Sequence, residues 1–478
     1  MTELKRNLGL NTTIAIVIGG VIGSGIFMKP SLMGSQLGSP LLLLSVWVVA
    51  GIITLFGALS NAEVAAMFPE TGGQYVFFKK MYGDAFAFLY GWAAFAVFNT
   101  AGNASIAYVF STYANVLVPL PQFSAATAHS IHLHIPFVGN FYPLENFGVK
   151  LLTIFLILLL TAVNYFSVKQ GGALQRVLTS LKAVAILILI GGLLLSGKGS
   201  AANISTSMIS MPQGMALVSA YMAAIAGAFW AYDGWNNITF IAGEIKNPQT
   251  VIPKSLFTGL SFCIIVYALV NLAYVYVLPI NKLATSSFVA SDAAAAVWGA
   301  TGAVLIALLV VLSTFGTTNA NVLATARVTF AMGQENRWFA WAGKVQPKYN
   351  TPGNALLLNA VWTCILILSG SFDMLTDMLI FVSWFFYGMS ALGVFILRKR
   401  MKTFLRSYKV WGYPVVPMLF VAFVAFFLCS TVYTDVLNYK NGTAPVINSV
   451  LGIIITCSGI PVYLLSNRKN KMKERKML

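Results

Sequence analysis

Apolar stretches of nearly the length that crosses a lipid bilayer recur along the whole chain, for example around 151–164 and 303–315. This repetition limits the possible folds more than any other feature of the sequence. Only 9% of the 478 residues are charged and 58% are hydrophobic, whereas soluble domains carry about 25% charged residues. Most of the chain is therefore expected to face lipid, because so little charge is available to cover a water-exposed surface.

The predicted spans must be helical, because the bilayer core offers no water to satisfy free backbone groups. Strands of a membrane barrel would be about ten residues long with alternating polar positions, which is not the pattern seen here. The sequence therefore predicts an all-α membrane protein of about twelve transmembrane helices. Their expected ranges are 13–36, 40–67, 82–113, 147–169, 173–196, 213–243, 253–279, 293–331, 353–370, 372–398, 411–437 and 446–466.

The 30 Lys and Arg residues give a formal net charge of +17, and their distribution predicts the orientation of the chain. They gather at alternate connections between spans, which is the positive-inside pattern. The clusters lie at 5–6, 79–80, 169–176, 246–254, 327–348, 398–409 and 468–476. We therefore expect a multi-pass protein of the plasma (inner) membrane with both termini in the cytosol. Attraction to membrane lipids accounts for the charge, so nucleic acid is not an expected partner.

The cysteines and histidines give no metal-site pattern. All four cysteines fall inside predicted spans and lack the spacing of a metal or disulfide framework. They are Cys263, Cys364, Cys429 and Cys457. The long connection 114–146 carries no Lys or Arg and contains His129, His132 and His134. Their loose spacing without cysteine favours a solvated outer loop over a zinc site, so neither a metal nor a cofactor is expected.

Two spans carry residues that weaken a helix near the middle of the membrane. The first contains Gly19, Gly20, Gly23 and Gly25, and each glycine lowers helix propensity by up to about 1 kcal/mol. The sixth contains Asp-Gly-Trp-Asn-Asn at 233–237. Matching broken helices in two halves of a transporter indicate a substrate site between inverted repeats. For the first run alone, close helix packing by small residues is the alternative explanation.

The two breaks divide the chain into predicted repeats of five helices each. The expected divisions are a cytosolic N-tail at 1–12, a first repeat at 13–200, a second inverted repeat at 201–410, two further transmembrane helices at 411–466 and a basic cytosolic tail at 467–478. Glycines interrupt the first apolar run and no cleavage-like site follows it, so we expect the first span to be retained.

An unwound helix exposes backbone groups that match the two ends of an α-amino acid. Free amides at Ser24, Gly25 and Ile26 would begin a half-helix, whose positive dipole end favours a carboxylate. Free carbonyls would accept hydrogen bonds from an ammonium, and the candidates are those of Val21, Ile22, Trp230 and Asp233. Ser24 adds a hydroxyl, while Trp230 and Tyr232 are large enough to cover a ligand. The remaining lining positions are Gly23 and Ala231.

Four ionisable residues within or at the ends of spans call for an explanation. Lys182 lies near mid-membrane, where a charged lysine costs at least about 2.5–3.5 kcal/mol and so needs a partner or must titrate. Asp233 either biases the pocket toward cationic substrates or makes hydrogen bonds at a helix end. Glu63 and Arg327 lie near cytosolic ends of spans and are expected to form gate or packing ion pairs.

Four groups of short motifs resemble a known family. They read Gly-Ser-Gly-Ile-Phe at 23–27, Pro-Glu-Thr-Gly-Gly-Gln-Tyr at 69–75, Tyr-Asp-Gly-Trp-Asn at 232–236 with Glu-Ile-Lys-Asn-Pro at 244–248, and Phe-Gly-Thr at 315–317 before Ala-Arg at 326–327. With them the chain resembles the amino acid–polyamine–organocation superfamily and, more narrowly, its L-type amino-acid transporter family. The resemblance implies a LeuT-like fold of five-plus-five inverted repeats with broken first and sixth helices. It also implies sodium-independent amino-acid transport by alternating access.

The family pattern assigns roles to individual positions. It places the substrate carboxylate on the amides of residues 24–26 and the amine on the carbonyls of Val21, Trp230 and Asp233. Trp230 occupies a gating position where family members often carry Phe, which puts the pocket's size in question. Animal members that pair with a heavy-chain glycoprotein use a cysteine in the region 114–146, which has none here. No covalent heavy-chain subunit is therefore expected.

The resemblance also gives Lys182 a role. In related transporters a lysine at this position fills the space that a sodium ion takes in sodium-coupled members. It would bridge the first span near Gly19 or Ile22 and the eighth near Thr317. Either this lysine is a structural tether of an exchanger, or it carries the proton of a symporter.

These features together predict a transporter of small to medium neutral L-amino acids, most simply an exchanger. Proton-coupled symport and transport of cationic or large neutral amino acids remain alternatives. No nucleophile with a base, metal cluster or Gly-x-x-x-x-Gly-Lys-[Ser/Thr] phosphate loop is found, so neither an enzyme nor an ATP-driven pump is expected. A channel would need a continuous polar path. A transporter-like solute receptor would bind the amino acid without carrying it.

Overall fold

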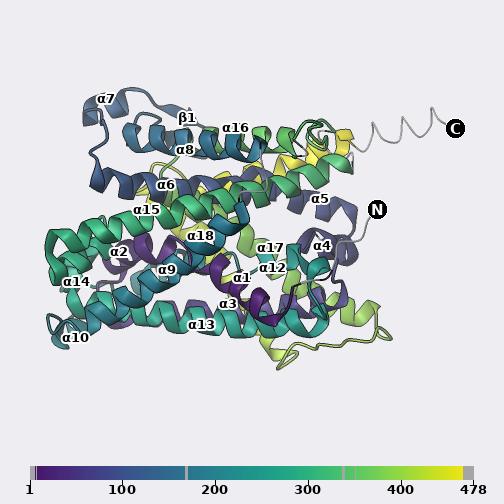
Figure 1. Cartoon of the computed structure of the whole chain (residues 1–478), viewed down its shortest axis with the longest axis horizontal. Helices are drawn as coiled ribbons and strands as arrows, with labels where there is room; N and C mark the ends of the chain where they lie inside the picture. The colour runs from purple at the N-terminus through teal and green to yellow at the C-terminus, as the bar shows by residue number, and fades with distance from the viewer. Residues whose placement is uncertain are drawn as a thin grey trace. The chain divides into compact units, whose positions relative to one another are not determined.

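The structure is a computed structural model that describes residues 6, 8–70, 72–166, 171–335, 340–349 and 351–466. Among these residues, nine helical runs are long and apolar enough to cross a membrane (Figure 1). They are α3 (Pro40–Met67), α5 to α6 (Asp84–Leu117), α8 (Phe147–Phe166), α11 (Gly214–Tyr232), α13 (Pro248–Val277), α15 (Val289–Gln334), α17 (Phe372–Arg400), α18 (Val415–Lys440) and Asn448–Ser466, which includes α19 (Asn448–Cys457). The prediction of an all-α membrane protein is confirmed.

The described helices give nine spans, or ten when the bent pair α1 (Leu10–Val21) and α2 (Gly25–Leu37) is one span, against about twelve predicted. The difference comes from two shorter apolar helices. One is α16 (Gly353–Ser369), and the other is the stretch Val184–Leu194 of α9 (Gly171–Leu194). Both coincide with predicted ranges, so the helices are present where the sequence placed them, but their described lengths do not establish further spans.

Local sequence signals account for several helix ends. Helix α3 begins with Pro40, whose fixed φ suits a first helical turn and whose missing N–H costs nothing there. Gly38 follows the last residue of α2 and caps the helix, because it has φ +61° and donates its amide to Gly34 O at 2.9 Å. Glycine tolerates this left-handed conformation without strain. The long run Asp84–Leu117 consists of α5 (Asp84–Ala93), a π-helical turn η1 (Ala94–Phe98) and α6 (Asn99–Leu117).

The connection 114–146 is more ordered than the predicted solvated loop. It contains α7 (Ala125–Ser130) and a two-stranded antiparallel hairpin of β1 (Leu133–Ile135) and β2 (Gly139–Phe141). The side chains of β1 are exposed, as a solvated loop requires, whereas Gly139 and Phe141 of β2 are buried. The amide of Asn140 donates to Pro445 O at 2.8 Å, so pairing with the segment before α19 orders the loop.

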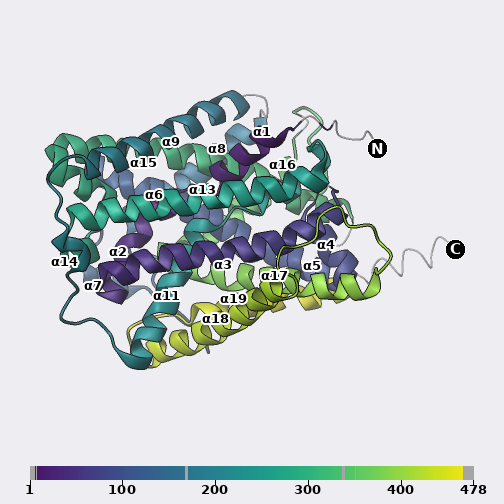
Figure 2. The same ribbon diagram turned by 90° about the horizontal axis from the view of Figure 1, so that it is seen from below.

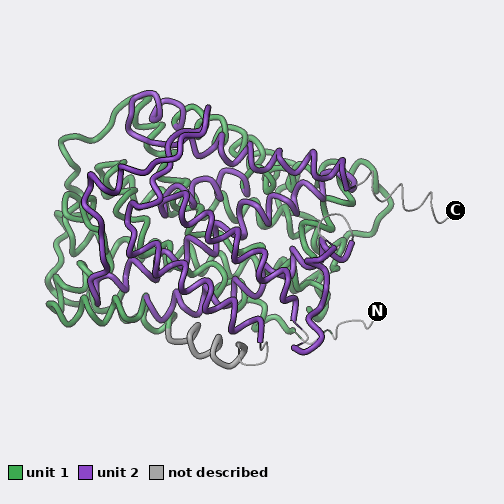
Figure 3. Tube along the Cα trace, turned by 90° about the horizontal axis from the view of Figure 1, so that it is seen from above, with its two compact units in different colours: residues 1–82, 181–310, 384–434 green, residues 83–180, 311–383, 435–478 purple. Residues whose placement is uncertain are grey.

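The chain divides into two compact units (Figure 3). Unit 1 comprises residues 1–82, 181–310 and 384–434, and unit 2 comprises residues 83–180, 311–383 and 435–478. Each unit takes segments from both predicted five-helix repeats, 13–200 and 201–410, so the units do not correspond to the repeats. The repeat boundaries stay a prediction.

Unit 1 contains both predicted helix breaks. Within it, α13 packs along α3 and α1, and α11 packs against α2 and α3. Helices α3 and α13 lie side by side (Figures 1 and 2). The shorter elements of this unit are α4 (Gln74–Tyr82), α10 (Ala202–Ser205), α12 (Asn237–Phe240), the 3-10 turn η2 (Ala242–Glu244) and α14 (Ile280–Thr285).

Unit 2 is built around three helices that pack on one another, α6, α8 and α16. Helix α19 packs on α5 and η1. Buried polar pairs join the helices, including Asn103 Nδ2 to Thr325 Oγ1 at 3.0 Å and Asn164 Nδ2 to Asn319 Oδ1 at 2.8 Å. Such bonds between helices satisfy polar groups that lipid would leave unpaired.

Candidate functional site

The first predicted break is present between α1 and α2, which meet at a bend of 44°. Helix α1 ends at Val21, and Ile22 leaves the helical region with ψ 96° while its amide still donates to Ile18 O at 2.8 Å. Helix α2 begins at Gly25. The run of glycines explains why the helix opens here, since each one raises the cost of continuing it.

The start of α2 offers donors for an anion. The first amides of a helix, here those of Gly25 and Ile26, have no acceptor within it, and they carry the positive end of the helix dipole. The amide of Phe27 turns back to Ser24 O at 3.1 Å. Ser24 itself is 3% exposed, and its hydroxyl is buried without a hydrogen-bond partner among the described residues. A buried hydroxyl without a partner is costly, which indicates a place for a ligand.

The second predicted break follows α11, which ends at Tyr232. Asp233 is extended with ψ 160°, and Gly234 has φ +98°, a conformation that favours glycine. The chain then turns through residues 234–236 into the single turn of α12, where the amide of Asn237 donates to Gly234 O at 3.1 Å. The Asp-Gly and Asn-Asn pairs therefore open the helix at the predicted place.

The two broken segments touch backbone to backbone. A Cβ on Gly234 would lie 2.5 Å from Gly20 O, and a Cβ on Gly25 would lie 2.6 Å from Ala231 Cα. Neither gap can hold a side chain, so glycine is required at both positions. Gly25 therefore serves helix packing, which was the alternative explanation for the first run, in addition to opening the helix. Close packing at Gly25 is compatible with opening of the helix, because a Cβ on Gly23 would meet only Val21 O, at 3.6 Å.

Tyr267 of α13 joins the two breaks, and no sequence pattern singled it out. Its hydroxyl lies 2.8 Å from Val21 O, at the last residue of α1, and 2.9 Å from Ala231 O, at the last residue but one of α11. The carbonyl of Trp230 accepts the amide of Asp233 at 3.3 Å. Two of the predicted ammonium acceptors, Val21 and Trp230, thus already receive one hydrogen bond each. A carbonyl has a second lone pair, so each can still accept another.

Asp233 is held by a residue far away in the sequence. Tyr387 of α17 donates its hydroxyl to Asp233 Oδ1 at 2.6 Å, and the ring of Trp235 packs on Tyr387 with 5.0 Å between ring centroids. One carboxylate oxygen is therefore engaged by the protein. This geometry agrees with the expected hydrogen bonding at a helix end, and it leaves less of the carboxylate available for a cationic substrate.

A chain of amide and hydroxyl groups anchors the other end of the second break. Asn61 Nδ2 of α3 donates to Asn236 Oδ1 at 2.9 Å, and Ser390 of α17 donates to Asn61 Oδ1 at 2.7 Å. Thr239 donates to Asn236 O at 2.8 Å. All of these residues are buried, so the network fixes the opened segment between α3 and α17.

The two aromatic residues predicted to cover the ligand, Trp230 and Tyr232, lie in different environments. Trp230 is 8% exposed, and its Cε3 would lie 3.0 Å from a Cβ on Gly25, so its ring lies beside the start of α2. Tyr232 is 0% exposed and donates its hydroxyl to Trp47 O of α3 at 2.9 Å. Its ring packs among Trp47 and Tyr267, so Tyr232 supports the site from behind.

Lys182 lies in α9 and is 8% exposed, as expected for a lysine in mid-membrane. Thr317 lies in α15 and donates its hydroxyl to Ser313 O at 2.9 Å. Lys182 belongs to unit 1 and Thr317 to unit 2, so the predicted bridge between them stays a prediction. The loop histidines bond locally, with His129 Nδ1 2.9 Å from Ala125 O and His134 Nδ1 2.9 Å from Asn140 Oδ1.

Apolar helices of membrane-spanning length, with two opened helices in contact at glycines, define the class of protein. Such discontinuous helices expose a helix start to an anion and helix-end carbonyls to a cation, away from lipid. This is the construction of a secondary transporter, and the spans make the chain a multi-pass membrane protein.

Comparison with known proteins shows which family of transporters the chain resembles. The sequence pattern of the amino acid permease family matches residues 8–458. The serine/threonine exchanger SteT of Bacillus subtilis is 31% identical over 96% of this chain and 96% of its own length. Human b(0,+)-type amino acid transporter 1 is 30% identical over 89% of this chain and 82% of its length. Mouse large neutral amino acids transporter small subunit 2 is 31% identical over 97% of this chain and 81% of its own length.

The chain belongs to the amino acid permease family. It is an amino-acid transporter and not an enzyme, and the resemblance to the amino acid–polyamine–organocation superfamily is confirmed.

Proposed function

We propose that the protein exchanges small to medium neutral L-amino acids across the plasma (inner) membrane without sodium, by alternating access around the two helix breaks. The observation that carries this proposal is the buried, unpartnered hydroxyl of Ser24 at the start of α2. The serine/threonine exchanger is similar over nearly its whole length, which supports both exchange and a small substrate.

The two charged groups of the substrate have complementary partners at the breaks. The carboxylate lies on the amides of Ser24, Gly25 and Ile26 and accepts the Ser24 hydroxyl, where the helix dipole adds to the attraction. The ammonium lies at the carbonyl ends of α1 and α11, with the carbonyls of Val21, Trp230 and Asp233 as acceptors, and Val21 and Trp230 each keep a free lone pair. Every amino acid carries both groups, so this part of the site does not select among them.

Selection among side chains falls to the surroundings of the breaks. The large ring of Trp230 beside Gly25 limits the room for a side chain, which favours small and medium substrates. The bond between Tyr387 and Asp233 engages the one carboxylate at the break and so favours neutral ones. Large neutral or cationic amino acids are the alternative.

Proton-coupled symport is the second candidate mechanism, and Lys182 is the residue that favours it. A buried lysine in mid-membrane is suited to bind and release a proton. For exchange, Lys182 needs only to form a fixed link between the two predicted repeats. Both mechanisms need the same two access states, so a flux measurement must separate them.

The test is uptake of a radiolabelled amino-acid panel into proteoliposomes, with and without unlabelled amino acid inside, at two external pH values. Exchange predicts uptake that requires internal substrate and is unchanged when sodium is omitted. Uptake into empty vesicles that follows an inward proton gradient would establish symport instead. Binding without flux under every condition would contradict a transporter and favour a receptor.

We also propose that both termini lie in the cytosol and that no heavy chain is disulfide-linked to the protein. The basic connections support the orientation, and the absence of cysteine from 114–146 supports the second point. The name of the mouse relative describes it as a small subunit, so a partner is a fair alternative. A disulfide-linked complex from native membranes that separates only under reducing conditions would contradict the proposal.

A further inference from the structure

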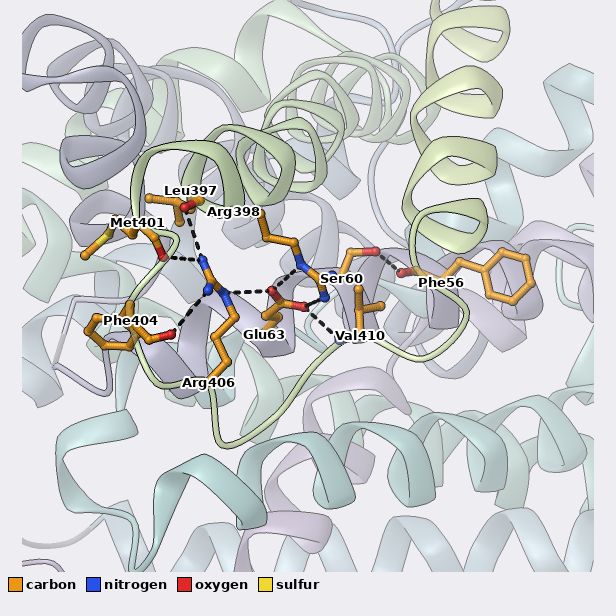
Figure 4. Close-up of polar contacts among 9 residues, drawn as sticks. All are labelled: Phe56, Ser60, Glu63, Leu397, Arg398, Met401, Phe404, Arg406 and Val410. Carbon is orange, nitrogen blue, oxygen red and sulfur yellow. Dashed lines mark hydrogen bonds and ion pairs between the residues drawn. The ribbon is translucent and has the colours of Figure 1, made fainter.

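The segment 399–415, which runs from the last two residues of α17 to the first residue of α18, carries a feature that transport itself does not require. Two arginines converge on one buried carboxylate at its start (Figure 4). Arg398 donates Nε and Nη2 to the two oxygens of Glu63 at 2.8 and 2.6 Å, and Arg406 Nε lies 3.4 Å from Glu63 Oε1. Glu63 also accepts the amide of Val410 at 2.7 Å, so α3 fixes both ends of the segment.

Arg406 is turned toward the protein. Its guanidinium donates to the carbonyls of Leu397, Met401 and Phe404 at 3.1, 3.0 and 3.2 Å (Figure 4). Glu63 therefore offsets one of the two arginine charges, and the carbonyls hold the segment in a compact turn. The two arginines are structural and do not form the outer surface.

The outer surface of the segment is basic. Lys399, Lys402 and Lys409 are exposed, and no Asp or Glu occurs between Asp377 and Asp435. Burial raises the pKa of the Tyr408 phenol to about 12, so this tyrosine adds no negative charge near neutral pH. The exposed lysines are thus left without an acidic neighbour along their own stretch of chain.

Large apolar side chains stand among these lysines. Leu405 is 89% exposed and Trp411 is 73% exposed. Two other aromatics of the segment are packed, since Phe404 lies 6.0 Å from the ring of Phe68 and the Arg398 guanidinium lies 3.5 Å over Tyr413. Leu405 and Trp411 are the most exposed large apolar side chains of the segment, above Val415 at 52% and Phe404 and Tyr413 at 36% each, and a covering surface would remove them from water.

The position of the segment indicates what covers Leu405 and Trp411. It joins two helices that are long and apolar enough to cross a membrane, so it lies where those helices leave the bilayer. Exposed lysines beside a leucine and a tryptophan suit the boundary between lipid headgroups and acyl chains. We propose that residues 399–415 bind the anionic phospholipid surface, with the lysines at headgroup phosphates and Leu405 and Trp411 in the interface.

The test compares lipid binding by the full-length purified protein and two charge variants. Phosphatidylglycerol or phosphatidylcholine is titrated into the protein in nonionic detergent, and bound lipid is counted by native mass spectrometry. The first variant is K402Q/K409Q. The second is the matched control K282Q/K440Q, which removes two exposed lysines that lie outside the basic clusters.

The wild type and the control should bind phosphatidylglycerol in preference to phosphatidylcholine, and K402Q/K409Q should weaken that preference about five-fold. Leu405→Ser should weaken binding of both lipids, because it removes the apolar contact. Equal preference in all four proteins would overturn the proposal. Competition by millimolar inorganic phosphate that displaces the lipid completely would also overturn it, since a free-anion site would then explain the lysines.

Discussion

At the scale of single residues, Ser24 carries the clearest sign of a ligand. Its hydroxyl is buried and unpartnered where the first amides of α2 have no acceptor in their helix. The neighbouring Gly25 is a poor position for a test, because any side chain there would collide with Ala231 Cα. A change at Gly25 would alter helix packing together with binding, whereas Ser24→Ala removes only one oxygen.

Ser24→Ala should raise the KM for a neutral substrate about ten-fold, because a hydrogen bond to a charged group contributes about 1.5 kcal/mol. Initial rates of exchange in proteoliposomes measure this. Ser31→Ala is the matched control, since Ser31 lies in the same helix and its hydroxyl donates to Ala284 O at 3.3 Å. An unchanged KM for Ser24→Ala would place the carboxylate elsewhere.

Tyr387→Phe should raise the ratio of arginine to serine uptake, because it frees the oxygen of Asp233 that Tyr387 now engages. Competition between the two labelled amino acids in one vesicle preparation measures the ratio. Tyr82→Phe serves as a control that removes another hydroxyl bond to α17, the one to Met389 O at 2.7 Å. The same ratio in both variants and the wild type would show that Tyr387 does not shield Asp233.

Sequence patterns located the residues of the two breaks but not those that support them. Glycines at 19–25 and the Asp-Gly and Asn-Asn pairs at 233–237 are local signals, because they weaken a helix wherever they occur. Tyr267 and Tyr387 are tyrosines in apolar helices, and nothing in their neighbourhood in the sequence distinguishes them from packing residues. Their roles arise only when α13 and α17 are brought to the breaks.

At the scale of elements, the helix ends follow local chemistry and the contacts between helices do not. Helix α3 has the predicted bounds because Pro40 starts it and Pro69 follows its end closely. The hairpin β1–β2 was missed because its pairing partner, the segment near Pro445, lies about 300 residues away in the sequence. Glu63 was expected to form an ion pair, but its two arginine partners were not predicted.

Glu63→Gln should destabilise the protein by about 3 kcal/mol, because removing one partner of a buried ion pair leaves the other charges uncompensated. A fall in the Tm of detergent-solubilised protein, followed by intrinsic fluorescence, measures the effect. Glu145→Gln removes an exposed carboxylate of the outer connection and should leave the Tm unchanged. Equal Tm values for both variants would mean that the arginines find other partners.

At the scale of the whole molecule, the compact units and the predicted repeats divide the chain differently. Transport by alternating access needs a linkage that responds to the occupied site. Lys182 is the predicted linker, and its burial in α9 shows that its charge is withdrawn from water.

Lys182→Ala should reduce exchange at least ten-fold at every external pH, because the substitution removes the predicted link whether or not Lys182 carries a proton. Counterflow of labelled substrate at pH 6 and pH 8 measures the loss. Lys198→Ala removes an exposed lysine that donates to Val297 O at 2.7 Å, and it should leave exchange intact. Undiminished exchange by Lys182→Ala would exclude Lys182 from the mechanism.

The most direct test of the substrate site is an experimental structure of the protein with a neutral amino acid bound. The carboxylate should lie within hydrogen-bond distance of the Ser24 hydroxyl and the Gly25 and Ile26 amides. The ammonium should lie at the carbonyls of Val21, Trp230 and Asp233. An amino acid bound away from both breaks, with the Ser24 hydroxyl still unpartnered, would contradict the account.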